Sequence, residues 1–223
     1  MIVTIDGPAG SGKSSTARLV ASGLDAVYMD TGAMYRAVTL IALEKGIDIH
    51  DAKRLGDLSS QISITFGEKH DGQAIIMDGR DRSEEIRSGE VDRNVSVVSA
   101  HRQVRERLLD LQRGMAASLP AVVVEGRDTG SVVFPDADYK FFLTAGHEAR
   151  SRRRLEQLGG GSADAERIAG EISERDSRDS SRDIAPLKIP DGAEVIDNTN
   201  LSLDETVKLI VRFIGSGGAG RQI

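Results

Sequence analysis

The chain has 223 residues, a formal net charge of −6 and no cysteine. This length allows one core domain with insertions, and the lack of cysteine excludes disulfides and thiolate metal sites. The acidic balance argues against a nucleic-acid partner, which usually requires a basic face. Because the N-terminus MIVTIDG does not resemble a signal peptide and no apolar run approaches a membrane span, we expect a cytoplasmic protein that binds no membrane. No long exposed apolar stripe is evident, so we also expect a monomer.

Short apolar runs alternate with segments of helical periodicity, a pattern typical of βαβ units around a parallel sheet. The predicted elements are, in chain order, strand Ile2–Asp6, helix Ser14–Leu24, strand Ala26–Met29, helix Ala33–Lys45, helix Arg102–Arg113, strand Ala121–Glu125, strand Tyr139–Leu143, strand Ala193–Ile196 and helix Leu203–Ile214. The sequence therefore predicts an α/β fold.

Two segments interrupt this alternation. Ile62–Phe66 and Ala74–Met77 flank an Asp71-Gly72 pair, which predicts a β-hairpin outside the parallel sheet. Glu148–Asp183 is polar, rich in arginine and broken by Gly159-Gly160-Gly161, which predicts two helices joined by a hinge. We expect the glycine-rich tail from Gly215 to Ile223 to be disordered.

The strongest motif lies between the first strand and the first helix. It fits the pattern G-x-x-x-x-G-K-[ST] and comprises Gly7, Pro8, Ala9, Gly10, Ser11, Gly12, Lys13 and Ser14, with Ser15 directly after it. Such a loop turns its backbone N–H groups inward and forms a nest for the phosphates of a nucleotide such as ATP. Lys13 is expected to reach the β- and γ-phosphates, and the Ser14 hydroxyl is expected to bind Mg²⁺.

This phosphate-binding loop occurs in kinases, GTPases and ATPases. The chain has no Asn-Lys-x-Asp motif for guanine and is short for a mechanical ATPase, so a kinase is favoured. Glu125 ends the apolar run 121–124, where a carboxylate would face the metal, and is our second expected metal ligand. A kinase for another small acceptor such as UMP, AMP or shikimate, or an ATPase switch, stays open on these motifs alone.

Four clusters add a more specific signal. They are Ile5-Asp6-Gly7-Pro8, Asp30-Thr31-Gly32-Ala33-Met34-Tyr35-Arg36, the run EGRDTGSVVFPDA from Glu125 to Ala137, and Glu174-Arg175-Asp176-Ser177-Arg178-Asp179 leading to Ala185-Pro186-Leu187. In this order, from Ile2 to about Phe213, the chain closely resembles the bacterial cytidylate kinases. It departs from their pattern at Glu125, where aspartate is common, and at Ser14-Ser15, which stand for a frequent Gly-Thr pair.

The resemblance implies a nucleoside monophosphate kinase fold, which is a P-loop kinase fold with a five-stranded parallel core sheet flanked by helices. The core would comprise 1–30, 101–147 and 184–214, the acceptor-binding region with the hairpin about 31–100, and an arginine-rich helical lid about 148–183. The implied reaction is in-line transfer of a phosphoryl group from ATP, with Mg²⁺, to CMP or dCMP. The acceptor oxygen is already anionic near neutral pH, so no general base is expected.

The resemblance also implies roles for individual residues. Thr31 and Asp128 are expected to contact the cytosine or another part of the acceptor nucleotide, and Ser96 and Arg105 are also expected at the base. Those expected at phosphate groups are Arg36, Arg127 and Arg175, and Asp179 is expected to hold the ribose hydroxyls. The lid arginines expected near the transferring phosphate are Arg154 and Arg182. With Lys13, these two are the expected catalytic residues.

The spacing of charges in the lid supports a helix there. Arg175, Arg178 and Arg182 recur at i, i+3 and i+7, so we expect them to share one face. The pairs Glu171–Arg175 and Glu174–Arg178 are four residues apart and would brace the same helix.

Overall fold

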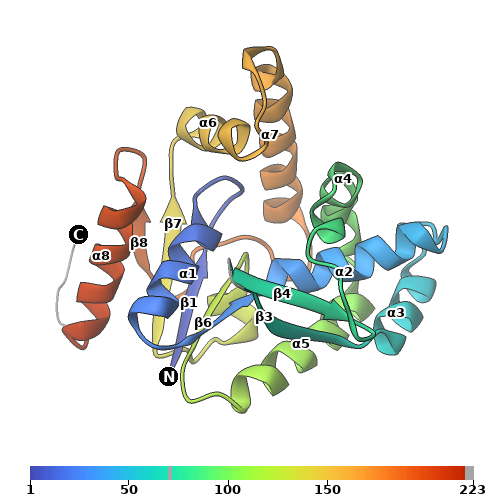
Figure 1. Cartoon of the computed structure of the whole chain (residues 1–223), viewed down its shortest axis with the longest axis horizontal. Helices are drawn as coiled ribbons and strands as arrows, with labels where there is room; N and C mark the ends of the chain where they lie inside the picture. The colour runs from blue at the N-terminus through green and yellow to red at the C-terminus, as the bar shows by residue number, and fades with distance from the viewer. Residues whose placement is uncertain (70–71, 219–223) are drawn as a thin grey trace. The chain divides into compact units, whose positions relative to one another are not determined.

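The computed structural model describes residues 1–69 and 72–218 (Figure 1). The chain forms two compact units. Unit 1 comprises Met1–Tyr28 and Pro120–Ile223, and unit 2 comprises Met29–Leu119. Helix α5 (Arg102–Ala117), which we expected in the core with 101–147, therefore lies in unit 2, where it packs against α3 (Ala52–Gln61).

Unit 1 is built on a five-stranded sheet in the order β2-β6-β1-β7-β8. Its strands are β1 (Ile2–Asp6), β2 (Val27–Asp30), β6 (Val122–Gly126), β7 (Tyr139–Thr144) and β8 (Glu194–Asp197). Strand β1 pairs in parallel with β6 and β7, and β7 pairs in parallel with β8. The predicted parallel core is thus confirmed, with each strand within one residue of its expected bounds. The register sets Ile5 opposite Glu125 and Asp6 opposite Gly126, so the ends of β1 and β6 lie at the same edge.

Helices α1 (Lys13–Gly23) and α8 (Leu203–Gly215) pack together beside this sheet (Figure 1). The core between them and the strands includes Ile5, Val20, Phe141 and Ile210, all fully buried. Burying such side chains stabilises the fold by about 2 kcal/mol each. The predicted disorder from Gly215 onward is wrong for 215–218, because the helix includes Gly215 and the N–H groups of 217 and 218 bond back to its last turn. Residues 219–223 lie outside the described residues.

The predicted helical pair of the lid is confirmed as α6 (His147–Gln157) and α7 (Ala165–Ser181), which lie side by side (Figure 1). A short 3₁₀ turn, Ser162–Asp164, joins the linker to α7. Ile168 and Ile172 of α7 are buried together with Ala9 of the glycine loop, and Leu155 of α6 packs against them. The lid helices therefore have an apolar contact with the loop itself.

The charge pattern on α7 differs in part from the prediction. Glu174 pairs with Arg178 at 2.8 Å as expected, but Glu171 pairs with Arg167, also at 2.8 Å, rather than with Arg175. Arg178 is exposed beside Glu174, whereas Arg182 is nearly buried just beyond the helix end. Arg175 and Arg182 both act on the buried carboxylate of Asp179, whereas the exposed Arg178 does not join them.

Unit 2 contains five helices or turns around a small antiparallel sheet within its described residues. They are α2 (Thr31–Glu44), α3, the 3₁₀ turn η1 (Glu85–Arg87), α4 (Gly89–Val98) and α5, and the strands are β3 (Ile64–Lys69), β4 (Gly72–Met77) and β5 (Arg80–Asp81). The predicted hairpin is confirmed, since β3 and β4 pair with Ile64 opposite Met77. Its turn at 70–71 lies outside the described residues.

Helices α3 and α4 were not predicted. Ser88 caps α4, and Val91, Val95 and Val98 bury one face at helical spacing. Valine has a low helix propensity, so this stretch does not read as a helix until its apolar face is packed. None of the described helices has the length and apolar character needed to cross a membrane.

Candidate functional site

The glycine loop joins β1 to α1 at the carboxyl edge of the sheet, where ligands bind in open α/β folds. Gly7 has φ +151°, and a Cβ there would lie 2.0 Å from the backbone oxygen of Leu143 in β7. Gly10 has φ +73°, and a Cβ there would lie 2.8 Å from the backbone oxygen of Arg150 in α6. Only glycine fits at either position, because β7 and α6 approach the loop so closely.

Lys13 is the first residue of α1 and is buried. Its Nζ donates to the Pro8 oxygen at 2.7 Å and lies 3.5 Å from the Ser11 hydroxyl, so it points back across the loop. Burial lowers the pKa of Lys13 to about 7, the charge of Arg127 adds to that effect, and Glu125 opposes it. A bound phosphate would supply the negative charge that this buried ammonium group requires.

Ser14 and Glu125 come together at the ends of α1 and β6. The Ser14 hydroxyl donates to Glu125 Oε1 at 2.5 Å, and the Tyr28 hydroxyl donates to the same oxygen at 3.0 Å. A hydroxyl and a carboxylate are hard oxygen ligands, and Mg²⁺ in phosphate sites typically takes only one or two such ligands from the protein. The side chains present therefore fit the metal expected here. Ser15, by contrast, is exposed on α1.

Asp6 ends β1, directly before the glycine loop, and is fully buried. Its Oδ1 accepts hydrogen bonds from the N–H and the hydroxyl of Thr129, both at 2.8 Å, and its Oδ2 accepts from the N–H of Gly130 at 2.7 Å. Burial raises the pKa of Asp6 to about 6, although the bonds from Gly130 and Thr129 lower it; the charge of Asp128 raises it further. Sequence reasoning missed this residue.

The raised pKa predicts a pH-dependent stability. Because the folded-state pKa exceeds the ordinary value of 3.8, the contribution of protonated Asp6 is fully present below about pH 4 and is lost as the pH rises through 6. A shift of two units corresponds to about 3 kcal/mol. We expect the unfolding free energy of the wild type, relative to that of Asp6→Asn, to fall by about this amount between roughly pH 3.5 and pH 7. Urea denaturation of both proteins measures it, and a constant difference contradicts it.

A cluster of arginines and aspartates follows β6 and the end of α7. Arg127 Nε donates to Asp179 Oδ2 at 3.0 Å. Arg182 lies 3.4 Å from Asp128 Oδ1 and 3.9 Å from Asp179 Oδ1. Burial would raise the pKa of Asp179, but the charges of Arg127, Arg175 and Arg182 together outweigh burial and lower it. The structure thus brings together five residues that the resemblance had assigned to the acceptor or the lid.

Two residues of the lid helices hold the glycine loop. Arg150 of α6 donates to the Ala9 oxygen at 2.9 Å and forms an ion pair with Asp176 of α7. Asp176 in turn accepts from the Ala9 N–H at 2.9 Å. Neither residue was predicted, because an arginine and an aspartate 26 positions apart on separate helices carry no sequence signal of their contact.

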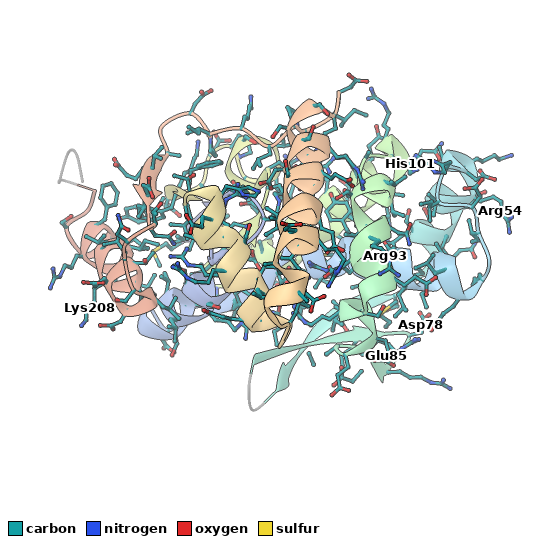
Figure 2. All side chains as sticks on the ribbon, turned by 90° about the horizontal axis from the view of Figure 1, so that it is seen from above. Arg54, Asp78, Glu85, Arg93, His101 and Lys208 are labelled. Atoms are coloured by element: carbon teal, nitrogen blue, oxygen red, sulfur yellow. The ribbon has the colours of Figure 1, made fainter. Side chains whose placement is uncertain are left out.

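The residues expected in unit 2 lie on α2, α4 and α5. Arg36 donates to Asp92 of α4 at 3.2 Å. Arg105 is buried, donates to the Ser99 oxygen at 3.0 Å and lies 5.4 Å from the ring centre of Tyr35. Thr31 and Ser96 are buried as well. In contrast, Arg54 (Figure 2), Arg93 and Lys208 are exposed, as charged side chains usually are.

Comparison with known proteins agrees with this geometry. A family model described as cytidylate kinase matches residues 3–216. The cytidylate kinase of Shouchella clausii is 47% identical over 95% of both chains, and that of Pelotomaculum thermopropionicum is 45% identical over 96% of both. The chain belongs to the cytidylate kinase family.

Solved structures show that the fold extends beyond this family. A gluconokinase from Sinorhizobium meliloti has a TM-score of 0.50 and 12% identity, with 96% of this chain and 91% of that chain covered. TT1252 from Thermus thermophilus has a TM-score of 0.51 and 16% identity, with 99% and 98% covered. At these identities the likeness concerns the fold alone, which is that of a P-loop kinase.

The remaining candidate of this family member is Arg154. It lies on α6 and donates to Gln157 of the same helix at 2.9 Å. Its role at the transferring phosphate therefore stays a prediction, as do the ligand-binding roles of the other residues.

Proposed function

We propose that this cytidylate kinase family member transfers the γ-phosphoryl group of ATP to CMP and dCMP, yielding CDP and dCDP. The observation that carries the proposal is that two sets of charged groups occur together in unit 1. Lys13 is buried in the glycine loop that follows β1. Arg127 and Asp128 directly follow the neighbouring strand β6, and they pair with Asp179 and Arg182. One end of this arrangement suits a nucleoside triphosphate, and the other presents arginines for an anionic acceptor. We further propose a cytoplasmic monomer that binds neither nucleic acid nor membranes.

In this mechanism the chain contributes positioning and charge. Within the loop Gly7–Ser15, the backbone N–H groups from Gly10 onward would cradle the ATP phosphates, and Lys13 would neutralise charge on the group in transfer. Ser14 and Glu125 would hold Mg²⁺, which neutralises phosphate charge when it is bound. The acceptor phosphate needs no proton removed, so no residue acts as a general base.

The acceptor-binding roles follow from the family resemblance. In unit 1, Arg127 and Arg175 would bind the acceptor phosphate, Asp179 the ribose, and Arg154 and Arg182 the group in transfer. In unit 2, Thr31, Arg36, Ser96 and Arg105 would bind the phosphate and the base. The carboxylate of Asp128 would accept from the cytosine amino group, whereas the carbonyl of uracil would place a second acceptor against it.

The test is kcat/KM for CMP, dCMP, UMP and AMP, measured by ADP release, in wild type and Asp128→Ala. We expect CMP and dCMP to be the best acceptors, UMP to be about 100-fold weaker, and AMP to be near background, because two acceptors that face each other in a buried site cost several kcal/mol. The variant should reduce the CMP-to-UMP ratio at least about tenfold.

The control variant is Asp136→Ala, which removes an exposed carboxylate from the same segment and should keep the ratio. A wild type that prefers UMP, AMP or shikimate, or that releases ADP equally fast without an acceptor, contradicts the proposed function. An unchanged ratio in Asp128→Ala removes Asp128 from base recognition only.

A further inference from the structure

The buried carboxylate of Asp6 joins the two halves of the site within unit 1. It directly precedes Gly7 along the chain, and its three hydrogen-bond donors all belong to Thr129 and Gly130. These two residues directly follow Arg127 and Asp128, which contact Asp179 and Arg182. One side chain therefore ties the glycine loop to the segment that carries the acceptor-side pairs.

The segment that directly follows Asp128 is tightly packed. A Cβ on Gly130 would lie 2.7 Å from the Thr4 hydroxyl and 3.1 Å from Pro190, so the backbone is pressed against β1. The N–H groups of Val132 and Val133 donate to the backbone oxygen of Asp128 at 2.9 and 3.2 Å. These bonds close the π-helical turn Thr129–Val133. The backbone of residues 127–130 is therefore constrained both by its contact with β1 and by this turn.

The three donors to Asp6 are uncharged, and the nearby charge of Asp128 has the same sign as that of Asp6 and raises its pKa. An ionised carboxylate buried among neutral donors is costly, although hydrogen bonds to a charged acceptor are stronger than neutral ones. A neutral side chain could accept hydrogen bonds at the end of this strand with a smaller desolvation cost than a carboxylate. A carboxylate is favoured instead where three converging N–H and O–H groups must be held firmly, because its hydrogen bonds are stronger.

We propose that Asp6 is a positioning residue that holds residues 127–130, and thereby Arg127 and Asp128, in register with the glycine loop. This inference rests on the proposed function, in which Arg127 binds the acceptor phosphate and Asp128 binds the base. It does not require Asp6 to touch either nucleotide. Its loss should therefore affect the use of the acceptor far more than the binding of ATP.

The experiment compares Asp6→Asn with Asp138→Asn. Asp138 is a matched control, since its exposed carboxylate accepts from the N–H of Ile2 at the opposite end of the same strand. We expect Asp6→Asn to lower kcat/KM for CMP by about 100-fold, because an amide N–H would face a backbone donor and displace the segment. The Kd of a fluorescent ATP analogue, measured without acceptor, should change less than about threefold. The control should match the wild type in both measurements.

A second pair of variants covers the case in which Asp6→Asn does not fold. Thr129→Val removes one hydroxyl donor at nearly constant shape and should lower kcat/KM for CMP by about five- to tenfold, whereas Thr129→Ser retains the hydroxyl and should remain near wild type. Equal losses for ATP binding and CMP use, or a Thr129→Ser enzyme as poor as Thr129→Val, would overturn the positioning role. A wild type that does not phosphorylate CMP instead refutes the proposed function, so the two failures are distinguishable.

Discussion

Lys13→Ala is expected to lower kcat for phosphoryl transfer by about 100- to 1000-fold, because it removes a preorganised positive charge at the transferring group. The fold should persist. Lys13 is buried and that burial lowers its pKa to about 7, so its charge does not stabilise the fold by itself. Steady-state kinetics at saturating ATP and CMP, with circular dichroism for the fold, measure the effect.

The control for this variant is Lys208→Ala, which removes the exposed lysine of α8 labelled in Figure 2. This lysine pairs with Asp204 at 2.6 Å. It should leave kcat unchanged, because Lys208 is not among the candidate site residues. The fold should also persist, since an exposed ion pair contributes less than about 1 kcal/mol to stability. A folded Lys13→Ala protein with wild-type kcat would refute the assignment of the glycine loop to phosphoryl transfer.

Arg182→Ala is expected to lower kcat by about 100-fold with little change in the KM for ATP, since a charge that acts on the closed transition state contributes less to binding of the ground state. Arg182 donates to the Ala185 oxygen at 2.6 Å and lies beside Asp128 and Asp179. Its loss should also lower the free energy of unfolding by about 3 kcal/mol, because two buried carboxylates lose a partner. Urea denaturation measures this second effect.

Arg167→Ala, on the helix α7 that precedes Arg182, provides the comparison. Arg167 is exposed and pairs with Asp164 and Glu171, so its removal should change neither kcat nor stability appreciably. If Arg182→Ala weakens ATP binding and leaves kcat intact, then Arg182 is a ground-state ligand rather than a catalytic residue.

The parallel sheet and the glycine loop could be predicted because their signals are local. Strand β1 occupies its expected bounds, Ile2–Asp6, since a run of β-branched residues directly precedes the glycines. The loop requires glycine at positions such as Gly7, where the close approach of β7 leaves no space for a side chain. Such requirements appear as residue types at fixed spacing, which is what a sequence displays.

The lid was predicted less accurately because side-chain partners depend on where a helix ends. Helical spacing correctly paired Glu174 with Arg178, but Arg182 lies beyond the last turn and contacts Asp128 and Asp179 instead. Likewise, α5 has the expected apolar periodicity, yet its packing against α3 places it in unit 2. Periodicity identifies an apolar face and does not specify the partner.

By itself the sequence determined the strands of the parallel sheet, the phosphate-binding loop and, through its motifs, the family. Only the tertiary structure revealed Asp6 beneath Thr129 and Gly130, and the Arg150–Asp176 pair on Ala9. The physical reason is the same in both cases. A buried charge is stabilised by donors or partners brought from distant parts of the chain, and a lone aspartate or arginine in the sequence carries no mark of which groups will surround it.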